Sequence, residues 1–141
     1  MGLFIKTEYV IPIASVIVHN KNDDTVLLGK RTNIEEFGLY GMPGGKQEVR
    51  ERIEDTVCRE LLEETGLVAK KLTRLGYIDE FIYQHFACHI FLCQVFEGEV
   101  TNKEPSKCQG WEWIMRTNIS KMENKSELLY LVHQGDMLYG W

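Results

Sequence analysis

The sequence predicts an α/β (α+β) domain in which a mixed β-sheet lies between helices. Runs rich in β-branched and aromatic residues, typical of strands, occupy residues 9–19, 25–31, 76–84, 85–97 and 111–114. Two segments with helical periodicity occupy residues 51–65 and 126–134. This order of strands and helices is typical of a sheet covered by helices.

The composition limits the size and the class of the protein. A chain of 141 residues is expected to form one domain over residues 1–141. Its hydrophobic content of 44% is enough for a core, and 26% charged residues suit a water-exposed surface. A net charge of −5 argues against passive binding to duplex nucleic acid or an anionic membrane. An anionic small molecule would therefore need a metal ion or local Lys and Arg side chains.

The cysteines and the N-terminal residues both indicate a cytoplasmic protein. None of the four cysteines forms a Cys-x-x-Cys pair, so we expect free thiols in a reducing compartment. Residues 1–7 lack the long apolar core of a signal peptide, and no apolar run approaches the roughly 20 residues of a membrane span. The sequence leaves both a monomer and a homodimer open.

The first two strands are predicted to form a hairpin. Residues 9–19 are rich in β-branched residues and read as a buried strand, and Pro12 places its start at a sheet edge or bulge. Residues 20–24 are polar and predict a turn, after which residues 25–31 return as the second strand.

Charged and flexible residues follow this hairpin. Lys30 and Arg31 end the second strand, where they face either solvent or phosphate groups. After a polar loop, residues 39–43 predict a short strand that leads into Gly44 and Gly45. A glycine pair lets the backbone come close to a ligand.

The first helix is predicted from about Glu51 to Thr65, with Gly66 as its C-cap. Its core-facing stripe recurs every four residues and consists of Ile53, Val57 and Leu61. That stripe packs the helix on the sheet and leaves its acidic face toward a cleft.

The second half of the chain contains further strands and a helix. Residues 68–75 predict a basic connector or edge strand, and residues 76–84 and 85–97 predict a second hairpin. The strand at 85–97 is apolar on both faces, which indicates a central position. After a loop, residues 111–114 form a short strand and residues 126–134 an amphipathic helix with a serine cap.

The first helix carries a cluster of carboxylates. Glu60, Glu63 and Glu64 stand at i, i+3 and i+4 and therefore share one helix face. Like charges so placed repel one another, and a cation would reverse the sign of that interaction. Carboxylate oxygens are ligands that Mg²⁺, Mn²⁺ and Ca²⁺ prefer. The alternative interpretation is a solvated acidic face.

Residues 45–67 resemble the Nudix box: Gly, five residues, Glu, seven residues, Arg-Glu, an aliphatic, one residue, Glu-Glu, one residue, Gly and an aliphatic. The fixed positions are all met, by Gly45, Glu51, Arg59, Glu60, Leu61, Glu63, Glu64, Gly66 and Leu67. Arg50 stands where many members carry a glycine. The resemblance implies a MutT-like hydrolase of the Nudix superfamily, with an α/β/α sandwich fold that agrees with the predicted order of elements.

The resemblance also implies a metal site. The carbonyl of Gly45 and the carboxylates of Glu60, Glu63 and Glu64 would ligate Mg²⁺, with Mn²⁺ as a possible substitute. Divalent ions neutralise phosphate charge, activate water and orient the leaving group in such hydrolases. Glu60 and Glu63 are therefore also candidates for the catalytic residues.

Other box residues would position the catalytic groups. Arg59 is expected to orient a neighbouring carboxylate, and Glu51 to brace the loop through an ion pair with Arg59. The general base would be a box glutamate or a glutamate from a later loop. Of the later ones, Glu112 is preferred to Glu104 because it precedes Trp113 near the expected site.

Nudix hydrolases cleave a nucleoside diphosphate linked to another group. Several segments of this chain limit which group that could be. Residues 28–31 ahead of residues 41–45 resemble members that hydrolyse nucleoside triphosphates. Residues 104–113 resemble a nucleotide-diphosphatase branch that includes the human type-15 enzyme. ADP-ribose hydrolases carry a proline where this chain has residues 81–82, Phe and Ile, so the sequence does not favour ADP-ribose. Dinucleoside-polyphosphate hydrolases carry a tyrosine where this chain has Tyr83, which makes them the rival class.

We therefore expect Mg²⁺-dependent hydrolysis of a nucleoside triphosphate to monophosphate and pyrophosphate, a housecleaning activity. Arg31, Lys30 and Lys46 are the candidates for binding phosphate. Candidates for stacking on the base, with core packing as the alternative for each, are Phe37, Tyr40, Phe86 and Trp111. A diadenosine-polyphosphate or other nucleoside-diphosphate hydrolase is the rival expectation. A nucleotide-binding module without hydrolysis is the alternative from another class, which an intact box disfavours.

Overall fold

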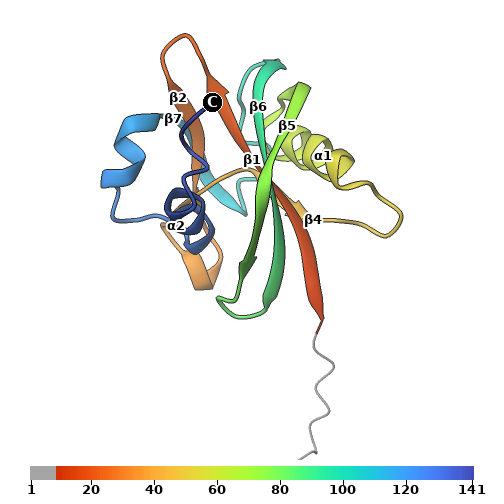
Figure 1. Ribbon diagram of the computed structural model, residues 1–141. Coiled ribbons are helices and arrows are strands. Elements are labelled where there is room, and N and C mark those ends of the chain that lie inside the picture. Colours follow the sequence, from red (N-terminus) through yellow and green to blue (C-terminus); the bar gives the residue numbers. More distant parts are fainter. Residues whose placement is uncertain (1–8) are drawn as a thin grey trace, which may run out of the picture.

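A seven-stranded mixed sheet forms the centre of the computed structural model, which describes residues 9–141 (Figure 1). Residues 1–7, on which the signal-peptide prediction rests, lie outside the described residues. The strands are β1 (Val10–Asn20), β2 (Thr25–Arg31), β3 (Tyr40–Gly41), β4 (Gly44–Lys46), β5 (Val68–Glu80), β6 (His85–Glu97) and β7 (Cys108–Met115). The helices are α1 (Ile53–Thr65) and α2 (Glu127–Gln134), with 3₁₀ turns η1 (Ile34–Glu36) and η2 (Arg116–Lys121).

Strand β1 runs through the middle of the sheet. The strand order is β3-β2-β1-β6-β5, with β4 also paired to β1 and β7 also paired to β2. β1 and β6 are parallel, whereas the other pairs are antiparallel. The mixed sheet, the β1–β2 hairpin and the central position of β6 are confirmed.

β1 has two different partners along one edge. Residues 13–15 pair with β4, and His19 and Asn20 pair with β2. Between these pairings, the N–H of Val16 donates to the carbonyl of Pro43 at 3.0 Å. β2 and β4 therefore diverge from β1, and the cavity described below lies between them.

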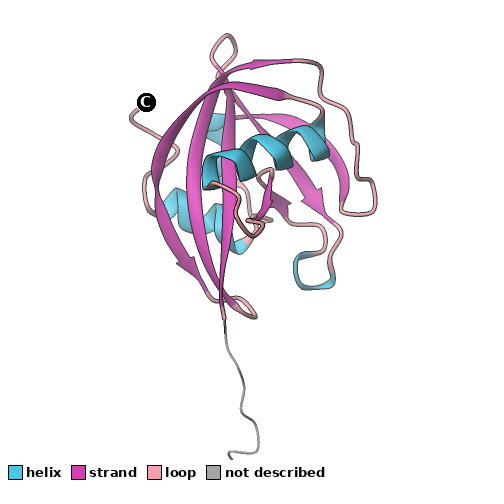
Figure 2. Ribbon diagram, turned by 90° about the vertical axis from the view of Figure 1, so that its right-hand side faces the viewer, coloured by secondary structure: helices cyan, strands magenta, loops and turns pink. Residues whose placement is uncertain are grey.

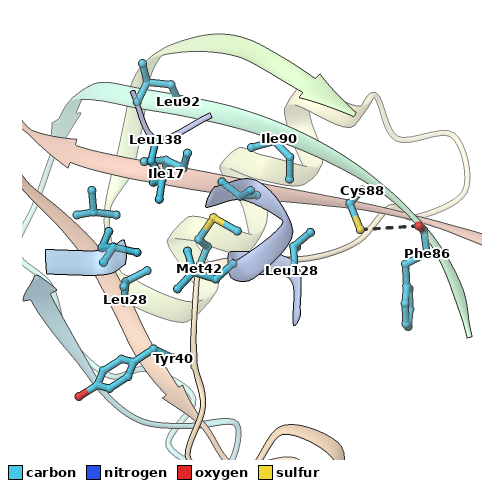
Figure 3. Packing of buried hydrophobic residues seen from close by; sticks show 14 residues of the cluster. Ile17, Leu28, Tyr40, Met42, Phe86, Cys88, Ile90, Leu92, Leu128 and Leu138 are labelled. Carbon is cyan, nitrogen blue, oxygen red and sulfur yellow. Dashed lines mark hydrogen bonds between the residues drawn. The ribbon is translucent and has the colours of Figure 1, made fainter. Parts of the chain in front are cut away.

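The two helices cover opposite faces of the sheet (Figures 1 and 2). Under α1, Val57 and Leu61 pack against a buried cluster that includes Val16, Val18 and Phe91. On the other face, Leu128, Leu129 and Val132 of α2 pack against a second cluster, which includes Ile17, Leu28 and Ile90 (Figure 3). The expected α/β/α arrangement results from these two apolar layers.

Both helix ends that the sequence marks are present. Gly66 adopts a left-handed conformation with a φ of 81°, and its N–H donates to the carbonyl of Leu62, which closes α1. Ser126 accepts a hydrogen bond from the N–H of Leu129 and so caps α2. Neither α-helix in the described part of the chain is long and apolar enough to cross a membrane.

Two predictions about strands need correction. The edge-strand alternative for residues 68–75 is confirmed, but the strand predicted separately at 76–84 is its continuation, since β5 pairs with β6 from Val68 to Glu80 through several bulges. Pro12 lies in the central strand rather than at an edge. Its carbonyl accepts from the N–H of Gln47 at 3.0 Å, so its missing N–H points the same way, just beyond the end of β4.

The cap of α2 gives a test of this fold. Ser126→Ala removes the acceptor for the N–H of Leu129, in a side chain that is almost fully buried. We expect the free energy of unfolding to fall by about 1 kcal/mol. Ser120→Ala, at an exposed position in η2, is the control and should leave stability unchanged in urea unfolding. Equal stabilities of the two variants would contradict the capping contact.

Candidate active site

The acidic face of α1 lies against the glycine strand β4. The N–H of Gly44 donates to Oε2 of Glu64 at 3.0 Å, and Glu64 is buried. A Cβ atom added to Gly45 would lie 2.4–2.7 Å from the carboxylate of Glu60. Because real Cβ atoms do not approach so closely, glycine at position 45 makes the space that the Glu60 carboxylate occupies.

Arg59 connects these carboxylates to the preceding loop. Its Nε donates to Oε2 of Glu51 at 2.7 Å, which is the ion pair predicted from the sequence. Its Nη1 donates to Glu60 at 2.9 Å and to Glu63 at 3.3 Å, and its Nη2 donates to the carbonyl of Lys46 at 3.0 Å. The hydrogen bond from Arg59 lowers the pKa of Glu51 to about 2. One guanidinium thus fixes the loop, the helix and the end of β4 together.

The loop before α1 makes a sharp turn at Arg50. Arg50 has a φ of 67°, in the left-handed region that favours glycine, and it stands where many Nudix proteins carry glycine. The next residue, Glu51, turns back and also accepts hydrogen bonds from the N–H of Glu48 and the hydroxyl of Thr56. This turn holds Glu51 against Arg59.

Burial makes the ionised forms of Glu60 and Glu64 less favourable and so raises the pKa of both carboxyl groups. Burial, with the charge of Glu60 as the next cause, raises the pKa of Glu64 to about 8. Burial also raises the pKa of Glu60, against the lowering effect of Arg59. Two adjacent carboxyl groups in a buried setting are costly when ionised unless a proton or a cation accompanies them.

The donor set fits a hard divalent cation. Within residues 9–141, no three His, Cys, Asp or Glu side chains converge on one point as metal ligands would. Glu63 instead contacts Arg59 and is half exposed. Mg²⁺ usually binds through one or two carboxylates and retains several waters, and Glu60, Glu64 and the backbone at Gly45 offer such oxygens.

A cavity of about 350 Å³ joins these carboxylates to basic side chains. Its wall consists of Gly29, Lys30, Arg31, Gly44, Gly45, Lys46, Glu60, Glu64, Lys107 and Cys108. The structure thus brings the predicted phosphate-binding residues Arg31 and Lys46 to the same cavity as the glutamates. Lys30 also contributes to the wall, but its Nζ lies over the ring of Tyr40, 5.5 Å from the ring centroid. Lys107 was missed by the sequence reasoning, although it lies in the 104–113 segment that suggested the diphosphatase branch.

Arg31 is held firmly within this wall. Its Nη2 donates to the carbonyl of Met42 at 3.3 Å, and its guanidinium lies over Gly41, where a Cβ would approach it to 2.5 Å. Its Nε is buried and has no hydrogen-bond acceptor among residues 9–141. Arg31 therefore retains an unused donor beside the cavity.

The structure does not bring Glu112 or Tyr40 to this cavity. Glu112 pairs with Leu28 across β2 and β7 and so shares the sheet face of α2, opposite the face of α1. The hydroxyl of Tyr40 donates to Oε2 of Glu112 at 2.6 Å, which raises the pKa of Tyr40 to about 12. Tyr40 packs in the hydrophobic core on that face (Figure 3). Tyr40 therefore has a core-packing role instead of the predicted stacking on the base.

The remaining candidates have other surroundings. Phe37 is 67% exposed and does not line the cavity beside the glutamates. Trp111 packs in the cluster under α1, and its Nε1 donates to the carbonyl of Glu64 at 3.2 Å. Glu104 contacts Lys107 at 3.5 Å and accepts backbone hydrogen bonds from residues 107 and 108. Glu104 is therefore placed to position Lys107 at the cavity.

A second cavity of about 200 Å³ adjoins the first. It is lined by Ile13, Ser15, Arg31, Glu36, Gly44, Gly45, Lys46, Glu80, Tyr83, Phe86 and Leu128. Glu80 is 6% exposed, and burial, with the charge of Glu36 as the next cause, raises its pKa to about 7. The sequence reasoning missed Glu80, because a lone glutamate near a strand end is usually solvated. Glu80 pairs with Phe86 across β5 and β6 and so lies on the sheet face that α2 covers.

The fold and this site together define a protein with an acidic helix and a basic rim around one cavity. The NUDIX domain family model matches residues 11–132, and the chain belongs to this family. NUDIX hydrolases generally use divalent metal ions. The family membership agrees with the resemblance seen in residues 45–67.

Individual relatives support the same family. The chain is 33% identical over 102 residues to the ADP-ribose pyrophosphatase of Methanocaldococcus jannaschii, a match that covers 70% of this chain and 60% of that protein. It is 30% identical over 105 residues to the 8-oxo-dGTP diphosphatase of Escherichia coli, covering 74% of this chain and 79% of that protein. A MutT NUDIX hydrolase structure from Burkholderia pseudomallei matches with a TM-score of 0.76 and 26% identity, over 87% of this chain and 96% of that one.

The buried carboxyl of Glu80 predicts a pH-dependent cost to stability. Its pKa rises from an ordinary 4.5 to about 7 on folding, so between these values the folded state holds more protons than the unfolded state. Stability is therefore lost as the pH rises through this window. Glu80→Gln removes that loss, and we expect the variant to gain up to about 3 kcal/mol over the parent between about pH 4 and pH 8.

This prediction is measured by urea unfolding of both proteins across the pH range. Glu99→Gln is the matched control, because it makes the same change at an exposed position and should leave the pH dependence of stability as in the parent. A stability difference between parent and Glu80→Gln that does not change with pH would contradict the burial of an ionisable group.

Proposed function

We propose that this protein is a Mg²⁺-dependent nucleoside triphosphate diphosphatase, which adds water to its substrate and releases a monophosphate and pyrophosphate. The observation that carries this proposal is the cavity whose wall combines Glu60 and Glu64 with Arg31 and Lys46. A triphosphate needs cations along its oxygens, and a metal-binding hydrolase needs carboxylates beside them. The cavity offers both within one wall.

Different residues of the chain would bind phosphate, hold the metal ion and remove a proton from water. Arg31, Lys30, Lys46 and Lys107 would bind phosphate oxygens, and Arg31 suits them best because its planar guanidinium matches their geometry. Mg²⁺ held at the α1 glutamates would neutralise phosphate charge and lower the pKa of water. Proton removal from water falls to a glutamate of α1, since Glu112 lies on the other face of the sheet.

Two rival substrates have specific support. One relative is named ADP-ribose pyrophosphatase, and the match spans 60% of that protein. For diadenosine polyphosphates, the support is Tyr83, which is 54% exposed and lines the second cavity beside Arg31. The name of the E. coli relative, an 8-oxo-dGTP diphosphatase, instead supports a nucleoside triphosphate.

The proposed setting follows from the same features. All four cysteines are free thiols, which supports a reducing compartment, and we propose that the enzyme acts in the cytoplasm. Its partner would be a small nucleotide rather than duplex nucleic acid or a membrane. We propose one catalytic domain over residues 1–141, as a monomer or a homodimer.

Metal binding should stabilise the folded protein. An ion that binds the folded state and not the unfolded state raises stability by mass action. We expect millimolar Mg²⁺ to raise the melting temperature, and Glu60→Gln or Glu64→Gln to reduce that rise. Glu54→Gln is the matched control, because Glu54 is exposed on α1 and does not line the cavity. A melting temperature of the parent that does not change with Mg²⁺ would contradict the proposed metal site.

The substrate class is tested by product analysis. The parent is assayed with nucleoside triphosphates, ADP-ribose and diadenosine tetraphosphate, with and without Mg²⁺. We expect pyrophosphate from triphosphates, a fall in kcat/KM of at least about tenfold for Arg31→Ala, and partial recovery in Arg31→Lys. Arg74→Ala, at an exposed position on β5, is the control.

Tyr83→Ala separates the rival substrates. If the protein acts on diadenosine polyphosphates, this variant should lose activity on diadenosine tetraphosphate far more than on any mononucleotide. A parent preference of more than about tenfold for diadenosine tetraphosphate or ADP-ribose over every triphosphate would overturn the proposed substrate class.

A further inference from the structure

The second cavity shares a wall with the first. Arg31, Gly44, Gly45 and Lys46 line both. Its volume of about 200 Å³ is below the roughly 300–1,000 Å³ of sites for drug-sized ligands. The second cavity therefore suits one ring system attached to a larger molecule whose charged part lies in the first cavity.

Apolar and aromatic side chains form one part of the wall of the second cavity, and charged side chains form the rest. Ile13 of β1, Phe86 of β6 and Leu128 of α2 line it from different elements (Figure 3 shows Phe86 and Leu128). Phe86 is 5% exposed, and the ring of Tyr83 contacts it edge-on with centroids 5.4 Å apart. A slot of this kind favours a flat ring that packs on apolar and aromatic surfaces.

Glu80 is a polar group in this slot that lacks a hydrogen-bond partner. Its carboxyl receives no hydrogen bond from any residue in the range 9–141, and the residue is only 6% exposed. The charges that act on it come from other elements: Glu36 of η1 and Glu127 of α2 repel it, and Arg31 of β2 attracts it. A buried carboxyl group without donors is costly, so N–H groups of a bound molecule would relieve that cost.

We propose that the second cavity binds the base of the nucleotide and that Glu80 selects a base whose edge carries two adjacent N–H donors, as guanine does with N1–H and its 2-amino group. This inference rests on the proposed function, which puts the phosphates in the first cavity. An ionised carboxylate accepts hydrogen bonds through both oxygens and donates none. Adenine presents an acceptor at N1, and hypoxanthine lacks the 2-amino group, so neither makes both bonds.

Guanosine and inosine monophosphates test this selection, because they differ by the 2-amino group alone. Isothermal titration at about pH 8, where Glu80 is ionised by its pKa of about 7, measures both dissociation constants. The parent should bind guanosine monophosphate at least about tenfold more tightly than inosine monophosphate. Glu80→Gln should reduce that ratio to about threefold or less, because the amide carries one acceptor oxygen.

Asp79→Asn, on the adjacent residue of β5, should keep the parent ratio. Equal binding of the two monophosphates by the parent, binding of neither, or an unchanged ratio in Glu80→Gln would each overturn the role of Glu80. A melting curve of Glu80→Gln at the same pH establishes that the variant is folded.

The same variants distinguish this inference from the proposed function. Guanosine selectivity that depends on Glu80, in a protein that hydrolyses no triphosphate, would uphold the base site and overturn the proposed function. Hydrolysis of guanosine and inosine triphosphates with equal kcat/KM, unchanged in Glu80→Gln, would uphold the hydrolase and overturn the base site.

Discussion

The close contact between α1 and β4 is the constraint on which the site depends. Glu64 receives the N–H of Gly44, and Glu60 occupies the space that a side chain at position 45 would fill. Arg59 then fastens the helix to the loop and to the end of β4. Because both glutamates pack against the backbone of β4, their carboxyl groups lie within the cavity wall and not on the free surface of α1.

The cavity results from the pairing of β1 with two different strands along one edge. One edge of β1 pairs first with β4 and then with β2, so these two strands separate where Lys30 and Arg31 end β2. Basic residues from one strand thus face carboxylates carried by a helix packed beside the other. The net charge of −5 does not oppose binding of an anion here, since the local charge is mixed.

Local patterns made most of the fold and part of the site predictable. Periodicity, glycine and serine caps and the spacing of residues 45–67 identified both helices and the Arg59–Glu51 ion pair. Faces set by long-range register were not predictable. Glu112 pairs with Leu28 and Glu80 pairs with Phe86, and these pairings place both carboxyl groups on the α2 side of the sheet.

Arg31 stands between the two cavities and interacts electrostatically with a carboxyl group in each, Glu64 in the first and Glu80 in the second. Any ligand that takes up the charge of Arg31 in one cavity changes the balance in the other. Such linkage is reciprocal, so the factor by which a bound phosphate alters affinity for the base equals the factor by which the base alters affinity for phosphate. For a nucleotide bound as proposed, a single arginine would couple the binding of its two halves.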